Sequence, residues 1–145
     1  MYLLDTNVVS ELRKAKKGKA NHNVVVWAES VNSASLFLSV VTVLELEMGV
    51  LDKERNDPEQ GAVLRGWLDN QVLSAFAGRI LVIDTSVARR CAGLHVPDRS
   101  PERDALIAAT ALEHGMTVVT RNVDDFIPTG VRLLNPWEVA VDATL

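Results

Sequence analysis

The sequence has little cysteine and no long apolar run, and each shortage excludes a class of protein. Its 145 residues include one cysteine, Cys91, so the chain cannot form the disulfide framework of a small secreted domain. Charged residues interrupt every apolar stretch before it reaches the roughly 20 residues of a membrane span, and no basic, apolar leader precedes the first apolar residues. We therefore expect a cytoplasmic protein that does not enter a membrane.

Sequence motifs for several reactions of α/β proteins are also missing. There is no GxxxxGK[ST] loop and no GxGxxG after an apolar run, which argues against a nucleotide site, and there is no GxSxG motif for a nucleophilic serine. The three histidines, His22, His95 and His114, are scattered, so no cysteine–histidine set could bind zinc.

Charge gives a mixed indication. The net charge of −4 does not by itself indicate a nucleic-acid-binding protein. Basic residues nevertheless cluster between Arg13 and Lys19, and such a cluster either faces phosphate groups or is a solvated loop.

Short apolar runs alternate with segments of helical periodicity. The runs predict strands over residues 2–4, 36–41, 79–83, 116–120 and 131–134. The periodic segments predict helices between these strands, including one over 43–54 with Leu44, Met48 and Leu51 on one stripe. Because strands that alternate with helices pair in parallel, we expect one α/β domain over residues 1–145, with three α/β/α layers and a mostly parallel sheet of about five strands.

Acidic and amide side chains follow the predicted strands. Asp5 ends the first strand, Glu45 lies one turn into the helix after the second strand, and Asp104 lies in the first turn of a helix beginning at Pro101. Asn122 and Asp125 follow the fourth strand. The carboxyl ends of parallel strands form the edge at which open α/β sheets bind ligands, so these five residues are candidates for one site.

Each acid also has a structural alternative. Asp5 could only cap the helix that follows it. Thr42 and Glu45 match a capping box, and Asp104 could complement a helix dipole. Asp84, in an Asp-Thr-Ser helix start, is best interpreted as a cap.

A shared pocket would need a positive partner. Two full charges ~4 Å apart repel by roughly 4 kcal/mol at an effective dielectric of about 20. Carboxylate oxygens suit Mg²⁺ or Mn²⁺, and such an ion can assist an in-line displacement at phosphorus. The pattern therefore favours metal-assisted phosphodiester chemistry.

Four stretches in this order resemble the PIN-domain ribonucleases, and most closely the VapC/FitB-like toxins and plasmid stability proteins: LLDTNVVSEL, SVVTVLELEMG, RDALIAATALEHGMTVVTRNVDDF and LLNPW. The resemblance implies an Mg²⁺- or Mn²⁺-dependent endoribonuclease that leaves 5′-phosphate and 3′-hydroxyl ends. It also implies a homodimer and an antitoxin partner that covers the site.

Carried over by position, the resemblance makes Asp5, Glu45 and Asp104 the first three acids of the site. Asp5 and Asp104 are expected to be the principal metal ligands, and Glu45 to be a further metal ligand or to orient the attacking water. For the fourth position it leaves Asn122 and Asp125 open, because an asparagine stands where the family can have aspartate. The alternative is a non-catalytic module of the same fold that binds metal or RNA.

Overall fold

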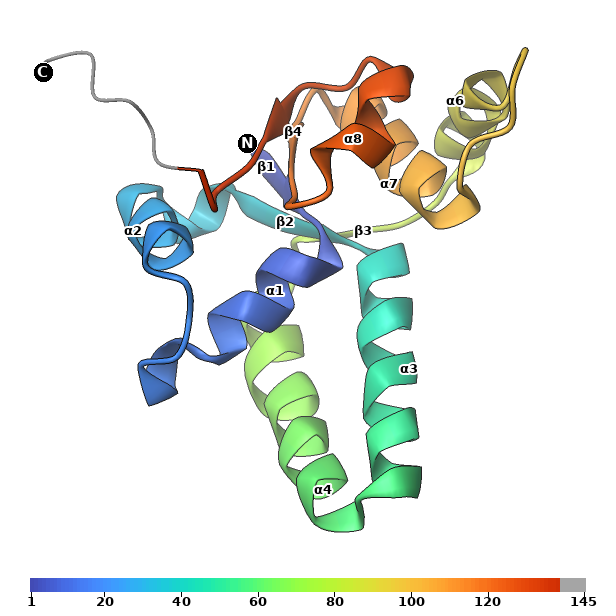
Figure 1. Ribbon diagram of the computed structural model, residues 1–145. Helices are drawn as coiled ribbons and strands as arrows, with labels where there is room; N and C mark the ends of the chain where they lie inside the picture. Colours follow the sequence, from blue (N-terminus) through green and yellow to red (C-terminus); the bar gives the residue numbers. More distant parts are fainter. Residues whose placement is uncertain (139–145) are drawn as a thin grey trace, which may run out of the picture.

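The structure is a computed structural model that describes residues 1–138, so the last seven residues of the predicted domain lie outside it (Figure 1). The strands are β1 (Tyr2–Leu4), β2 (Leu36–Ser39), β3 (Ile80–Leu81), β4 (Thr117–Val119) and β5 (Leu133–Leu134). The α-helices are α1 (Thr6–Arg13), α2 (His22–Ser30), α3 (Val40–Asn56), α4 (Pro58–Trp67), α5 (Leu73–Ala75), α6 (Thr85–Leu94), α7 (Glu102–His114) and α8 (Val123–Phe126). Short 3₁₀ turns are η1 (Ala15–Lys17), η2 (Ser33–Ser35) and η4 (Ile127–Thr129), and a π-helical segment, η3 (Leu68–Val72), connects α4 to α5.

All five strands pair in parallel, in the order β3-β2-β1-β4-β5. The central strand β1 lies between β2 and β4, with Tyr2 opposite both Leu36 and Thr117. Helices α6, α7 and α8 lie on one side of the sheet, and α1 lies on the other (Figure 1). The predicted three-layer α/β/α fold with a parallel sheet is confirmed.

The sheet separates two apolar cores because neighbouring residues of a buried strand point to opposite faces. Leu4 packs with Val8 of α1 and Val24 of α2 in the first core, which extends to α3 and η3. Leu3 packs with Ile107 of α7 and Phe126 of α8 in the second core. Both leucines are fully buried, which explains why the first strand has no polar alternation.

Helix α3 begins earlier than predicted. The expected strand over 36–41 ends at Ser39, whose hydroxyl accepts a hydrogen bond from the Val41 amide at 3.0 Å and caps the helix. Thr42 is therefore inside the first turn, and its hydroxyl donates to the Leu4 carbonyl at 3.4 Å. The capping box considered as the alternative role of Thr42 and Glu45 does not form, because Ser39 takes the capping position.

The predicted stripe on α3 lies on the solvent side. Leu44, Met48 and Leu51 are 51%, 41% and 53% exposed. Val41, Leu46 and Val50 form the buried face of the helix instead. Periodicity alone could not distinguish the two faces, because both carry large apolar residues.

Other helix ends agree with the sequence in part. Asp84 caps α6 by accepting a hydrogen bond from the Val87 amide at 2.9 Å, as predicted, and Gly115 ends α7 in a left-handed conformation with φ +66. The helix predicted to begin at Pro101 begins one residue later, because Pro101 takes the capping position and the preceding Ser100 hydroxyl donates to the Leu94 carbonyl at 3.2 Å. No helix within residues 1–138 combines the length and apolar character that crossing a membrane requires.

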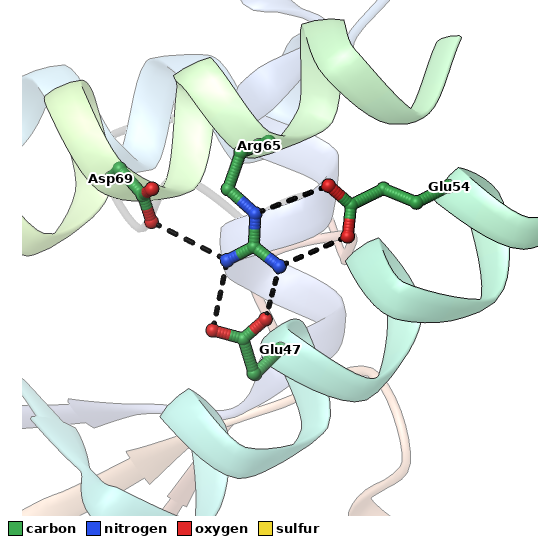
Figure 2. Close-up of polar contacts among 4 residues, drawn as sticks. All are labelled: Glu47, Glu54, Arg65 and Asp69. Atoms are coloured by element: carbon green, nitrogen blue, oxygen red, sulfur yellow. Dashed lines mark hydrogen bonds and ion pairs between the residues drawn. The ribbon is translucent and has the colours of Figure 1, made fainter. Parts of the chain in front are cut away.

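Helices α3 and α4 form a hairpin that extends away from the sheet (Figure 1). Arg65 of α4 makes two hydrogen bonds to Glu47 of α3, at 2.6 and 2.9 Å, and two to Glu54 at 3.1 and 3.4 Å (Figure 2). It also lies 3.5 Å from Asp69. A Cβ atom at Gly61 would come within 2.4 Å of the Glu54 Cα, so the close approach of the two helices requires glycine there.

Candidate active site

Asp5 is the best-fixed residue of the candidate site. It follows β1 directly, is 6% exposed, and accepts three hydrogen bonds: from the Thr6 amide at 2.8 Å, the Thr120 hydroxyl at 2.8 Å and the Asn7 amide group at 3.1 Å. Burial raises the pKa of Asp5 more than these hydrogen bonds lower it, and the charge of Glu45 adds to the rise. Asp5 therefore caps α1 and also holds an energetically costly charge at the sheet edge.

Asn7 and Thr120 connect the two loops that meet at Asp5. The Asn7 carbonyl oxygen accepts from the Arg121 amide at 3.2 Å, and its amide group lies 3.3 Å from the Thr120 hydroxyl. The Thr120 hydroxyl also accepts from the Asn122 amide at 3.0 Å. Neither residue stands out in the sequence as part of the site, although Thr120 ends the predicted fourth strand at the same sheet edge as Asp5.

Glu45 faces this edge from α3. One carboxylate oxygen accepts a hydrogen bond from the Thr6 hydroxyl at 2.8 Å, and the other lies 3.4 Å from a guanidinium nitrogen of Arg103. Because Thr6 directly follows Asp5 in the chain, the hydrogen bond from Thr6 holds Glu45 near Asp5. Neither Thr6 nor Arg103 stood out in the sequence.

Asp104 lies in the first turn of α7 and is half-buried. Burial raises its pKa to about 6, with further contributions from the charges of Asp5, Asp125 and Glu45. Within residues 1–138, no hydrogen bond holds the Asp104 carboxylate. The structure thus brings Asp104 into electrostatic range of three other acids, without a fixed partner of its own.

The two candidates for the fourth position are placed differently. Asp125 is exposed on α8, but its charge raises the pKa of Asp104, so it belongs to the same electrostatic cluster. Asn122 is exposed at the start of α8, where its side chain makes no capping hydrogen bond and only its backbone amide reaches Thr120. The roles of both residues remain predictions.

The donor chemistry of the cluster fits a hard divalent cation. The charges of Asp5, Asp125 and Glu45 all act on Asp104, and carboxylate oxygen donors suit Mg²⁺ or Mn²⁺. As they stand, however, no three acidic, histidine or cysteine side chains of residues 1–138 are arranged to hold an ion. Binding of such an ion would therefore require acidic side chains of the cluster to move.

The structure is thus an α/β domain with a parallel sheet, a buried aspartate and further acids at the carboxyl ends of the strands. The chain belongs to the PIN domain family, which it matches over residues 2–128.

Two similar proteins and one solved structure illustrate the relationship. The chain is 36% identical to the VapC ribonuclease Y4jK of Sinorhizobium fredii, over 97% of this chain and 100% of that protein. It is 38% identical to the toxin FitB of Neisseria gonorrhoeae, over 94% and 99% of the two chains. The crystal structure of FitAcB from Neisseria gonorrhoeae superposes with a TM-score of 0.86 and 36% identity, over 96% of this chain and 100% of that one.

Proposed function

We propose that the protein is an Mg²⁺-dependent endoribonuclease that acts in the cytoplasm as the toxin of a toxin–antitoxin pair. The observation that carries the proposal is the set of acids around Asp104, whose mutual repulsion a divalent cation would relieve. The names of the relatives support the same function, since one is a ribonuclease and one is a toxin. Mn²⁺ would serve in place of Mg²⁺, because both are bound by carboxylate oxygens.

The residues have distinct roles in this proposal. Asp5 is a fixed ligand, because three hydrogen bonds hold its carboxylate. Asp104 is an adjustable ligand, and Glu45 either completes the ligand set or orients the attacking water. When bound, the ion supplies positive charge that stabilises an in-line displacement at phosphorus. The expected products carry a 5′-phosphate and a 3′-hydroxyl.

The proposal includes a pH dependence. Because burial and neighbouring charges raise the pKa of Asp104 to about 6, this carboxylate takes up a proton under mildly acidic conditions. A protonated carboxyl group is a poor metal ligand. Metal affinity and cleavage should therefore both fall as the pH drops below about 6.

A second copy of the chain is the partner that we propose for the exposed stripe on α3. Leu44, Met48 and Leu51 form a solvent-exposed apolar surface. Two copies of α3 that pack against each other along this stripe would bury it, which agrees with the homodimer that the resemblance implies.

Light scattering after gel filtration tests the dimer. Leu51→Glu should shift the mass from two chains to one, whereas Val26→Glu, at a similarly exposed position on α2, should leave it unchanged. A wild-type protein with the mass of one chain would refute this part of the proposal.

The antitoxin is expected to be a second protein that covers the acidic cluster.

Cleavage of a long, end-labelled RNA tests the enzymatic function. Wild-type protein should cut the RNA with Mg²⁺ or Mn²⁺ and not with EDTA, and Asp5→Asn should remove the activity while the circular dichroism spectrum stays unchanged. Thermal stabilisation by Mg²⁺ without any cleavage would favour the non-catalytic binding module instead.

A further inference from the structure

Arg103 is a positively charged residue whose side chain contacts an acid of the candidate site. It precedes Asp104 in the first turn of α7, yet its guanidinium reaches across to α3 and lies 3.4 Å from the second carboxylate oxygen of Glu45. The first oxygen of Glu45 accepts the Thr6 hydroxyl. Both oxygens of Glu45 are therefore occupied within the protein itself.

The contact between Arg103 and Glu45 is weak by comparison with the Arg65 cluster. Arg65 makes paired, short hydrogen bonds to Glu47, whereas Arg103 makes one long contact and its side chain is 49% exposed. Exposed ion pairs of this kind contribute little to stability, because water screens the attraction and the long side chain loses freedom. Arg103 can therefore leave Glu45 at small energetic cost.

A divalent cation near Asp5 and Asp104 would compete for the same oxygen. Glu45 cannot turn toward such an ion without giving up Arg103, and an ion in the pocket would repel the guanidinium. Once released, Arg103 would be one residue from Asp104, with the planar donor group that binds phosphate oxygens in pairs.

We propose that Arg103 is a positioning residue that exchanges with the metal: it holds Glu45 when no ion is bound, and on metal binding it is released to hold a phosphate of the RNA backbone. The metal part of this inference needs only the acidic cluster, while the phosphate part rests on the proposed nuclease function. The two parts can therefore be tested separately.

Calorimetric titration with Mn²⁺, without RNA, tests the exchange. Arg103→Gln should bind Mn²⁺ about three- to fivefold more tightly than wild type, because the competing cation of an exposed pair is gone. Arg103→Lys, which keeps the charge, should bind Mn²⁺ with nearly the wild-type affinity.

Arg90→Gln is the matched control. Arg90 is also about half exposed, at 47%, and pairs with an acid, Glu113, at 2.6 Å. Glu113 lies nine residues along α7 from Asp104, a distance of about 14 Å in a helix. If Arg90→Gln tightens Mn²⁺ binding as much as Arg103→Gln, or if neither changes it, competition at Glu45 is refuted.

RNA cleavage kinetics test the release. At saturating Mg²⁺, Arg103→Gln should raise KM with a smaller effect on kcat and should lower the salt slope of substrate binding by about one. An unchanged KM and slope in a protein that cleaves RNA would refute the phosphate role. A wild-type protein that binds Mn²⁺ but cleaves no RNA would refute the nuclease function and leave the exchange to be judged by the titration.

Discussion

Asp104→Asn should stabilise the protein in the absence of metal, although it removes a candidate metal ligand. The folded state raises the pKa of Asp104 from 3.8 to about 6, so the ionised carboxylate destabilises the folded protein relative to the unfolded chain. The full difference corresponds to about 3 kcal/mol. Because the side chain is only half-buried, solvent screening reduces the expected gain to roughly 1–2 kcal/mol at neutral pH.

The direction of the pH dependence follows from the raised pKa. Below the unfolded value of 3.8 the carboxyl group is protonated in both states, so Asp104 carries no penalty there. The penalty grows as the pH rises and is complete above about 6, the folded value. The advantage of Asp104→Asn over wild type should therefore shrink as the pH is lowered from about 6 toward 4.

Thermal unfolding in EDTA measures this effect. At neutral pH the melting temperature of Asp104→Asn should exceed that of wild type by a few degrees, since about 1 kcal/mol shifts Tm by roughly 2–4 °C in a chain of this size. Millimolar Mg²⁺ should raise the wild-type Tm more than that of the variant. A folded Asp104→Asn that is less stable than wild type in EDTA at neutral pH would show that Asp104 is not a repelled charge.

Three other perturbations follow from the site. Thr120→Val should destabilise the protein by about 1–3 kcal/mol, because the buried Asp5 loses a hydrogen-bond donor. Chemical denaturation measures the loss, and an unchanged free energy of unfolding would contradict the hydrogen bond from Thr120 to Asp5. Asn122→Asp should add a second, weaker Mn²⁺ site in calorimetry, whereas Asp125→Ala should act mainly on the order of the short helix α8. Two strong sites in wild type would contradict this. The last change replaces four basic residues of the first loop with serine: Lys14, Lys16, Lys17 and Lys19. It should weaken cleavage of every RNA and reduce the salt dependence of cleavage. An unchanged salt dependence would identify the loop as a solvated connection.

The sequence determined the layers of the fold and the location of the candidate site. Apolar runs of three or four residues, such as Tyr2–Leu4, identify buried strands because both faces of the sheet are covered. Parallel strands then bring Asp5 and the loop after β4 to one edge without further information. The placement of Asp5, Glu45 and Asp104 could therefore be anticipated from local pattern and topology.

The remaining features depend on contacts between distant parts of the chain. Arg103 reaches Glu45 across 58 positions, and Thr120 reaches Asp5 across 115, so no local spacing indicates either pair. The start of α3 depended on competition between Ser39 and Thr42 for one capping position, which the three-dimensional position of the helix decides. The exposed face of α3 was equally ambiguous, because Leu44 and Leu46 are the same residue type with opposite burial.

The hairpin of α3 and α4 has a consequence for any molecule that meets it. Arg65 of α4 binds two carboxylates of α3 that lie almost two helical turns apart. Gly61 allows the two helices to approach closely near the loop that connects them. The two helices are thereby held in one arrangement before any partner arrives. Little conformational entropy would be lost when the exposed side of α3 is covered, so an interface of modest area there can be stable.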